Sequence, residues 1–251
     1  MQNTLRTPQP TVLPTLPGLE LYARYHDIRT GGDFFDAILV GPHIIFLLTD
    51  IAGERHEAQA IAAEVQDVFR NEAQQRFGVD GLNLMDTLGG LTREINLAIY
   101  NASGGSRLAP TFVGCFDLSL GLLAYINAGG PSPIFRDSDG THTLGHATVP
   151  LGLFTHITYE PAIQAFEPGS SFLLVTKGVL EARHERTQFG MERVISILES
   201  LSSASAKDLS HAALNQAHEF RKRPWYSLQN LPFTKPELPD DLTALALVRT
   251  V

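Results

Sequence analysis

Residues 31–53 read GGDFFDAILVGPHIIFLLTDIAG, and this segment says more about the fold than any other. Within it, His43–Leu48 has the apolar composition of a buried strand. Two acidic motifs adjoin apolar strand residues here, Gly31–Asp36 and Leu48–Gly53, and a third, Pro239–Thr243, comes late in the chain. Strand ends hold short carboxylates rigidly, so these aspartates converge on one point if their strands are neighbours.

The spacing of apolar residues outside this segment predicts the remaining elements. Leu19–Tyr25 alternates with period two, which predicts a strand with one apolar face. After Asp50 the period becomes helical and predicts helices at 56–77 and 82–101. Strand patterns then return at Thr111–Phe116, Leu122–Ile126, Pro133–Arg136 and Phe172–Thr176. A second pair of helices is predicted at 191–201 and 209–220, and a last strand at Leu242–Val248. Asp139-Gly140 marks a hairpin turn.

The order of elements predicts the fold class. Strands, two helices, strands, two helices and a strand are clustered rather than alternating, which favours a layered α+β domain with antiparallel sheets. The returning strands predict a second sheet. Residues 1–17, with four prolines, are expected to form an extended arm before a domain at 18–251. Pro224–Pro239, which contains Trp225 and Tyr226, is expected to be a long loop that either contacts a substrate or packs as a lid.

Composition excludes several classes of protein. The 251 residues are 43% apolar, enough for one sizeable core, and the net charge of −8 argues against nucleic acid or an anionic membrane as the partner. No apolar run exceeds five residues and no secretory signal is visible, so we expect a cytoplasmic protein without a membrane span. The single cysteine, Cys115, is followed six residues later by Gly121, so the C-x5-R loop of cysteine phosphatases is absent.

The aspartate motifs predict a hard divalent cation. Clustered ionised carboxylates are tolerable only with a cation between them, and oxygen ligands of this kind suit Mg²⁺ or Mn²⁺ rather than zinc or copper. For any one motif, the alternative is that the aspartate only forms a turn or caps a helix.

The order of these motifs resembles that of a known enzyme family. The matching segments are Leu16–Leu21, Gly31–Asp36, Asp50–Gly53, Tyr125–Gly129, Pro150–Gly152, Glu167–Gly169, Gly178–Ala182, Phe189-Gly190 and Asp240–Thr243. In this order they resemble the metal-dependent PPM (type 2C) serine/threonine protein phosphatases, and among these the bacterial sporulation stage II protein E branch, which acts on regulators of sigma factors. The resemblance covers about Leu16 to Val248.

The resemblance implies an αββα sandwich, in which helices flank two antiparallel sheets, and a binuclear Mn²⁺ or Mg²⁺ site. By position, the residues implied at the site are Asp50, shared by both metals, the backbone carbonyl of Ile51, Asp33 toward one metal and Asp240 toward the other, with Asp36, Asp241, Gly32 and Gly53 supporting them. Asp50 and Asp33 would act in catalysis through a metal-bound water that attacks phosphorus.

The chain departs from the family pattern at Lys177. The family has Thr-Asp-Gly where this chain has Thr176-Lys177-Gly178. Four aspartates balance two divalent ions, whereas three aspartates and one lysine carry −2 and balance one. We therefore expect Lys177 to pair with Asp50 and Asp240 in place of the first metal. The alternative is that Lys177 points into solvent and the site binds metal poorly.

Two lesser departures concern the surroundings of the site. The usual Gly-x-Gly turn reads Gly53-Glu54-Arg55, where Arg55 either reshapes access to the metals or simply begins the first helix in solvent. The usual histidine after Asn-Ala-Gly is Gly130, which removes a group that could touch substrate.

Two functions remain open from the sequence. The first is a protein serine/threonine phosphatase whose substrate, by resemblance, is a phosphorylated signalling protein such as an anti-sigma antagonist of the STAS type. The alternative is a catalytically impaired phosphatase-like module that binds a partner or phosphoprotein without turnover. Regulation by a partner, by metal supply or by association into a homodimer is equally compatible with the sequence.

Overall fold

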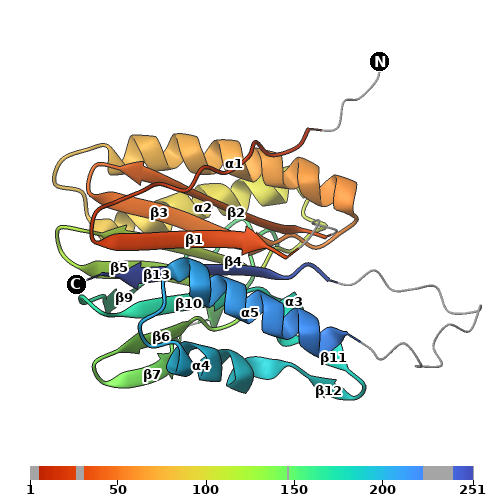
Figure 1. The fold of residues 1–251 in the computed structure, drawn as a ribbon. Coiled ribbons are helices and arrows are strands. Elements are labelled where there is room, and N and C mark those ends of the chain that lie inside the picture. Colours follow the sequence, from red (N-terminus) through yellow and green to blue (C-terminus); the bar gives the residue numbers. More distant parts are fainter. Residues whose placement is uncertain (1–5, 27–30, 146, 223–239, 251) are drawn as a thin grey trace, which may run out of the picture.

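The computed structural model describes residues 6–26, 31–145, 147–222 and 240–250. Two β-sheets pack face to face, and helices cover both outer faces (Figure 1). Helices α1 (Arg55–Phe77) and α2 (Leu84–Ser103) pack on one sheet, and α4 (Gly190–Ser200) and α5 (Ala206–Arg221) pack on the other. This is the αββα sandwich that the resemblance implied.

The first sheet holds the strands of the opening segment. Its members are β2 (Asp33–Val40), β3 (His43–Asp50), β4 (Thr111–Asp117), β5 (Leu122–Ala128), β8 (Ala147–Thr148) and β9 (Ala162–Ala165). All pairs are antiparallel except β5 with β8, a two-residue parallel pair. The sheet therefore follows the predicted antiparallel pattern with one short exception.

The second sheet combines the two ends of the domain with its middle. In spatial order its strands are β1 (Leu19–Tyr25), β13 (Thr243–Arg249), β10 (Ser171–Val175), β6 (Ile134–Asp137) and β7 (Gly140–Thr143). Three short elements lie between β10 and α4, namely α3 (Lys177–Leu180), β11 (Arg183–His184) and β12 (Thr187–Gln188). The predicted hairpin turn joins β6 to β7, with Asp137 opposite Gly140.

The predicted second sheet is present, but the returning strands are divided between the two sheets. β4 and β5 extend the sheet begun by β2 and β3, while β1 leaves its neighbours in sequence to pair with β13. The reason lies in burial. β3 is buried along nearly its whole length and takes a neighbour on each edge, whereas β1 is half-exposed at most positions and forms an edge strand.

Alternation along β3 divides its apolar run between two cores. Ile45 and Leu47 pack against α1 and α2, while Ile44, Phe46 and Leu48 pack between the sheets. Gly114 on β4 makes room for this arrangement, because a Cβ on Gly114 would lie 2.4 Å from the Phe46 ring. Since neither face is exposed to water, the predicted buried strand is confirmed.

The predicted helices agree with the structure to within a few residues. Asn83 caps α2, since its side chain accepts hydrogen bonds from the backbone of Met85 and Asp86 at 3.0 and 3.2 Å. Gly104 ends α2 with a φ of 62°, a left-handed conformation that favours glycine. The Asn83 cap accounts for the observed start at Leu84 rather than 82, and Gly104 accounts for the end at Ser103 rather than 101.

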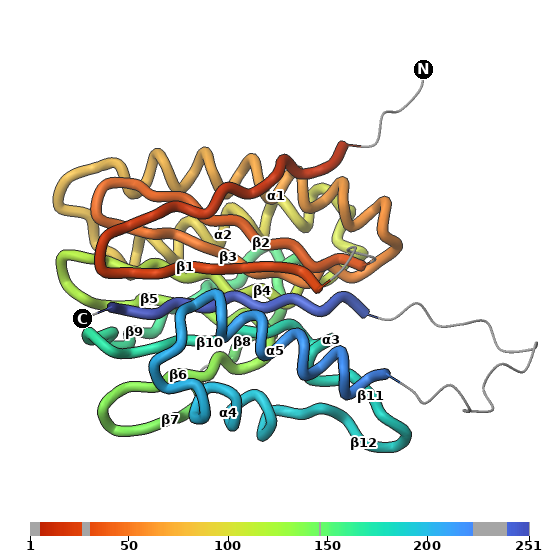
Figure 2. Tube along the Cα trace, in the orientation of Figure 1, coloured from red at the N-terminus to blue at the C-terminus, as the bar shows by residue number. Residues whose placement is uncertain are grey.

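The segment expected to be an extended arm has no helix or strand in its described part, and it runs along α1 (Figure 2). Gln9 and Gln66 of α1 exchange hydrogen bonds of 2.6 and 3.0 Å, and Arg6 pairs with Glu64. Pro224–Pro239 lies outside the described residues. Among the helices that the structure describes, none is both long enough and apolar enough to span a bilayer.

Candidate metal centre

Asp33 and Asp50 lie directly opposite one another at the open end of the β2–β3 hairpin. Both side chains point between the two sheets, because Asp33 lies two residues from Phe35 on β2 and Asp50 lies two residues from Leu48 on β3, and Phe35 and Leu48 pack there. Val40 faces His43 at the other end, so a two-residue turn sets the register. The convergence of these two predicted carboxylates therefore follows from local strand pairing.

The backbone beside these aspartates is tightly packed. The amide of Ile51 donates to the carbonyl of Gly32 at 3.0 Å. A Cβ on Gly32 would lie only 1.8 Å from the carbonyl oxygen of Ile51, so no other residue fits at position 32 without moving the backbone. Gly32 and the Ile51 carbonyl thus lie together beside the aspartate pair, as their proposed roles require.

Two threonines hold the carboxylate of Asp33: Thr243, which begins β13, and Thr176, which follows β10. Thr176 Oγ1 donates to Asp33 Oδ2 at 2.8 Å, and Thr243 Oγ1 donates to the same oxygen. The Thr243 amide in turn donates to Thr176 Oγ1 at 3.2 Å. Asp33 is only 2% exposed, so this contact joins the two sheets within the buried interior. Sequence reasoning did not assign either threonine a role, although both lie within or beside the quoted motifs.

The electrostatics of the centre are dominated by excess negative charge. Burial raises the pKa of Asp33 well above its ordinary value, the neighbouring Asp50 raises it further, and the two threonine hydroxyls oppose the shift. Burial also raises the pKa of Asp50, and Asp240 and Asp241 add to this effect, while Lys177 lowers it. Ionised carboxylates at this edge therefore destabilise one another in the absence of a cation.

Asp240 and Asp241 approach from the start of β13. Asp241 Oδ1 accepts a hydrogen bond from the Gly31 amide at 2.8 Å, which ties this segment to the first acidic motif. Gly178 packs against the same segment, since a Cβ there would lie 2.1 Å from the carbonyl oxygen of Asp241. Asp240 is exposed, and its charge acts on Asp50. Residues far apart in sequence thus meet at one edge of the sandwich.

Lys177 begins α3 at this edge. Its side chain is 63% exposed, and its Nζ lies 3.5 Å from Glu181 Oε1. The ion pairs between described residues include none from Lys177 to Asp50 or Asp240, so the direct pairing expected from sequence is not observed. Its charge nevertheless lowers the pKa of Asp50. Lys177 therefore partly offsets the acidic cluster without replacing an ion at contact distance.

The donor set fits a hard divalent cation that keeps much of its water. Within the described ranges, no group of three or more His, Cys, Asp or Glu side chains is arranged to hold a metal ion. Mg²⁺ is usually bound by one or two carboxylates together with waters, rather than by a complete protein cage. Asp33, Asp50 and the Ile51 carbonyl match that pattern, whereas a closed zinc site requires more nitrogen or sulfur ligands. A three-carboxylate centre that includes Asp240 stays a prediction.

Asp36 faces away from this centre. It lies on the helix-covered face of β2, where Arg70 of α1 contacts its two oxygens at 2.7 and 3.1 Å and Gln66 donates at 3.2 Å. Asp36 is fully buried, so these bonds anchor α1 to the sheet. Sequence reasoning proposed a supporting role for Asp36 but did not find Arg70, because no local signal links residues 34 positions apart.

Gly53 connects the centre to the helices. Its φ is 138°, and a Cβ there would lie 3.2 Å from Arg107 Nε and 3.3 Å from Glu57 Oε2. Arg107 Nη2 donates to Glu57 Oε2 at 2.5 Å, so this ion pair lies directly beside Gly53. Arg55 is exposed at the start of α1, as the simpler of its two predicted roles requires. The turn after Asp50 is thus held by charged side chains.

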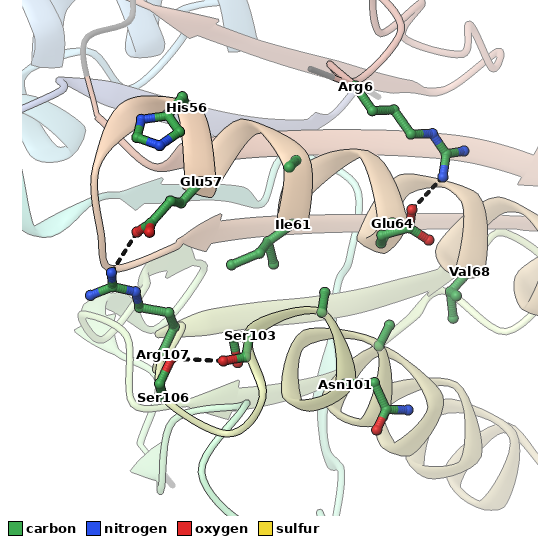
Figure 3. A pocket seen from close by; sticks show the side chains of 13 residues that line it. Arg6, His56, Glu57, Ile61, Glu64, Val68, Asn101, Ser103, Ser106 and Arg107 are labelled. Carbon is green, nitrogen blue, oxygen red and sulfur yellow. Dashed lines mark hydrogen bonds and ion pairs between the residues drawn. The ribbon is translucent and has the colours of Figure 1, made fainter. Parts of the chain in front are cut away.

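The same ion pair closes one end of a groove between α1 and α2 (Figure 3). The groove measures about 760 Å³, and the pair of Arg6 with Glu64 lies at its other end. None of the proposed metal ligands lines it. Although this groove is larger than the space beside Asp50, its position on the helical face separates it from the aspartate cluster.

Comparison with known proteins yields one family and several related folds. The sequence model of the family Stage II sporulation protein E (SpoIIE) matches residues 41–250. Phosphoserine phosphatase RsbP of Bacillus subtilis (strain 168) is 22% identical over 152 residues, which cover 60% of this chain and 36% of RsbP. The chain therefore spans about a third of the length of this relative.

Solved structures show the same fold. The RsbU and RsbW domains of Rv1364c from Mycobacterium tuberculosis match with a TM-score of 0.74 at 21% identity, over 95% of this chain and 63% of that chain. The catalytic domain of the serine threonine protein phosphatase PstP, in complex with two manganese ions, matches with a TM-score of 0.65 at 12% identity, over 93% and 99%. At these identities the likeness establishes the fold alone.

Proposed function

Because the family model covers most of its length, this chain belongs to the stage II sporulation protein E (SpoIIE) family, and we propose that it is a Mn²⁺- or Mg²⁺-dependent protein serine/threonine phosphatase. The proposed substrate is phosphoserine or phosphothreonine on a signalling protein of the sigma-factor regulatory type, such as an anti-sigma antagonist with a STAS fold. RsbP, named a phosphoserine phosphatase, and PstP, crystallised with two manganese ions, support this class of activity.

One observation carries the proposal. Asp33 and Asp50 face each other across a strand pair, and among the described residues neither forms an ion pair with a lysine or arginine. Burial of both groups makes this arrangement costly unless a positive charge is supplied from outside. A divalent cation held by Asp33, Asp50 and the Ile51 carbonyl would supply it.

Such a cation, when bound, would lower the pKa of a water and neutralise charge on the phosphoryl oxygens. The chain's own groups would do the rest. Thr176 and Thr243 fix the orientation of the Asp33 carboxylate by donating hydrogen bonds to its Oδ2. The same two bonds therefore also fix the direction of its second oxygen, Oδ1. Lys177, largely exposed at the same edge, would place an ammonium where a phosphate dianion approaches. We assign it to substrate attraction and to charge balance.

Lys177 also leads us to propose one bound ion rather than two. An ammonium at a position where the family has a carboxylate removes one ligand and adds a positive charge. Calorimetric titration with Mn²⁺ should give one site in the unaltered chain and two in Lys177→Asp. Lys207→Asp, which changes charge at α5, is the matched control and should retain one site. Equal stoichiometry and affinity in the unaltered chain and Lys177→Asp would refute the charge-replacement hypothesis.

The activity itself is tested with p-nitrophenyl phosphate in the presence of Mn²⁺. We expect turnover that is lost in Asp50→Ala and retained in Asp80→Ala, because Asp80 is an exposed aspartate between α1 and α2. If turnover is the same in the unaltered chain and in Asp50→Ala, none of it depends on the proposed metal centre, and that result would contradict the proposal.

The second candidate is a phosphatase-like binding module without turnover. Lys177 is the observation that favours it, because loss of one ion is expected to remove several kcal/mol of transition-state stabilisation. Absence of hydrolysis at millimolar Mn²⁺, together with measurable binding of a phosphoprotein, would favour this candidate over the enzyme.

A further inference from the structure

A cavity of about 170 Å³ opens between the two sheets beside Asp50. Its floor consists of Leu48, Phe112 and Leu174, each less than 5% exposed. These side chains belong to three strands from both sheets, so packing on either side holds the floor rigidly. The cavity is distinct from the helical groove of Figure 3, since the two share no lining residue.

One wall of the cavity is backbone, because residue 130 is glycine. The Gly130 amide donates to Asn127 Oδ1 at 2.9 Å, and Asn127 Nδ2 donates to the carbonyls of Gly130 and Pro131 at 3.2 Å each. Asn127 is 1% exposed, so this turn is fixed from within. A Cβ on Gly130 would meet only Asn127 Oδ1, at 3.1 Å. Because Gly130 lines the cavity, we expect a large side chain at position 130 to reduce the free space.

The mouth of the cavity carries the charges of the proposed active site. Asp50 and Lys177 both line it, and the Lys177 side chain is mostly exposed. An occupant must therefore have an apolar part that enters the cavity and must tolerate, or use, an ammonium beside it. A phosphate dianion next to an apolar group satisfies both requirements.

The size of the cavity selects the kind of occupant. Sites for drug-sized ligands measure roughly 300–1,000 Å³, so this space suits a single side chain better than a metabolite. The floor offers no charged partner, and a charged side chain buried there would lose its hydration without compensation. An aliphatic side chain would instead gain by leaving water.

We propose that this cavity binds an apolar side chain located next to the phosphoserine or phosphothreonine of the protein substrate. The proposal rests on the proposed phosphatase function, since the phosphate is taken to lie at Asp50. The cavity then acts as a specificity pocket, and Gly130 determines its size. The recognised feature is a phosphorylated segment with a leucine-like residue within two positions of the phosphate.

The test uses the full chain with Mn²⁺ and synthetic phosphoserine peptides that differ only by Leu or Ala at one position near the phosphate. At one such position, Leu should raise kcat/KM about tenfold over Ala, as expected for added apolar contact in a pocket. In Gly130→Leu this ratio should fall to about one, and Gly130→Ala should give an intermediate ratio. Gly145→Leu is the control, because a Cβ at exposed Gly145 meets no atom within 4 Å.

Two results would overturn the proposal: equal kcat/KM for Leu and Ala peptides at every position, or an unchanged ratio in a Gly130→Leu variant that retains the melting temperature of the unaltered chain. If no peptide is hydrolysed, the proposed function fails and the pocket is judged by calorimetry instead. A tenfold tighter Kd for the Leu peptide that is lost in Gly130→Leu would then support the pocket, and equal affinities would refute it.

Discussion

Asp33 and Asp36 lie three residues apart in β2, both almost completely buried, but their charges are compensated in opposite ways. Asp36 faces the helices, where the guanidinium of Arg70 contacts both of its oxygens. Asp33 faces the other sheet, where it receives two neutral hydroxyl donors and lies opposite a second carboxylate. The chain thus neutralises one buried aspartate itself and leaves the other without an internal cation among the described residues.

This difference separates a structural charge from a functional one. A buried carboxylate with its own arginine has little to offer a cation, because its charge is already compensated and most of its lone pairs accept hydrogen bonds. A buried carboxylate that repels its neighbour is retained only if something else compensates the cost. The same strand therefore presents an anchor for α1 on one face and an unneutralised acidic pair, open to a cation, on the other.

The largest expected effect is on catalysis, when the Asp33 carboxylate is removed. We predict that Asp33→Asn lowers Mn²⁺-dependent hydrolysis of p-nitrophenyl phosphate at least about 100-fold, since removal of one transition-state contact typically costs that much. Asp36→Asn, assayed well below its melting temperature, should change the rate less than about threefold because Asp36 faces away from the centre. Similar losses in both variants would show that the two aspartates do not differ in function.

The second-largest expected effect concerns Arg70, which joins α1 to the first sheet through Asp36. Arg70→Ala leaves the charge of Asp36 buried with only Gln66 as a donor, and we expect a loss of about 2 kcal/mol in unfolding free energy. The value lies below that of a fully buried pair because the Arg70 side chain is 36% exposed. Arg93→Ala is the control: the Arg93 side chain is 58% exposed and its partner Glu94 keeps a second arginine, Arg76, so the expected cost is below about 0.5 kcal/mol. Urea denaturation measures both, and equal costs would contradict the assigned role of Asp36.

Much of this contrast could be predicted from the sequence where it depends on neighbouring strands. The Gly41-Pro42 turn and the apolar run of β3 place Asp33 opposite Asp50, and period-two alternation then assigns Asp33 and Asp36 to opposite faces. The helices were likewise predictable, because their apolar stripes are long and regular.

The rest depends on contacts that no local pattern encodes. Arg70 reaches Asp36 only because α1 packs on the first sheet, and Thr176 and Thr243 reach Asp33 only because the second sheet packs beneath it. The assignment of β4 and β5 to the first sheet was missed for the same reason, since strand patterns do not state their partners. The expected pairing of Lys177 with Asp50 and Asp240 is not observed in the described part of the chain, and the contact that Lys177 makes with Glu181 within one helical turn was not anticipated.

The smallest expected effect concerns the hydroxyl groups that donate to Asp33, where Asp36 has an arginine instead. Thr243→Val keeps the shape and burial of the side chain but removes one donor to Asp33, which retains the bond from Thr176. We expect a loss of about 1–2 kcal/mol in unfolding free energy, between the values for a neutral and a fully ionised acceptor, because burial raises the pKa of Asp33. Thr92→Val is the matched control, because the equally buried Thr92 donates to the helix carbonyl of Leu88, and its loss should cost below about 0.5 kcal/mol.

A double-mutant cycle then assigns the cost to the carboxylate. If Thr243 matters because it solvates the charge of Asp33, the cost of Thr243→Val must shrink in an Asp33→Asn background, giving a coupling of about 0.5 kcal/mol or more. Additive costs in metal-free protein would mean that the hydroxyl stabilises the strand rather than the aspartate. In that case the two faces of β2 would differ in geometry alone, and the unneutralised charge of Asp33 would no longer distinguish it from Asp36.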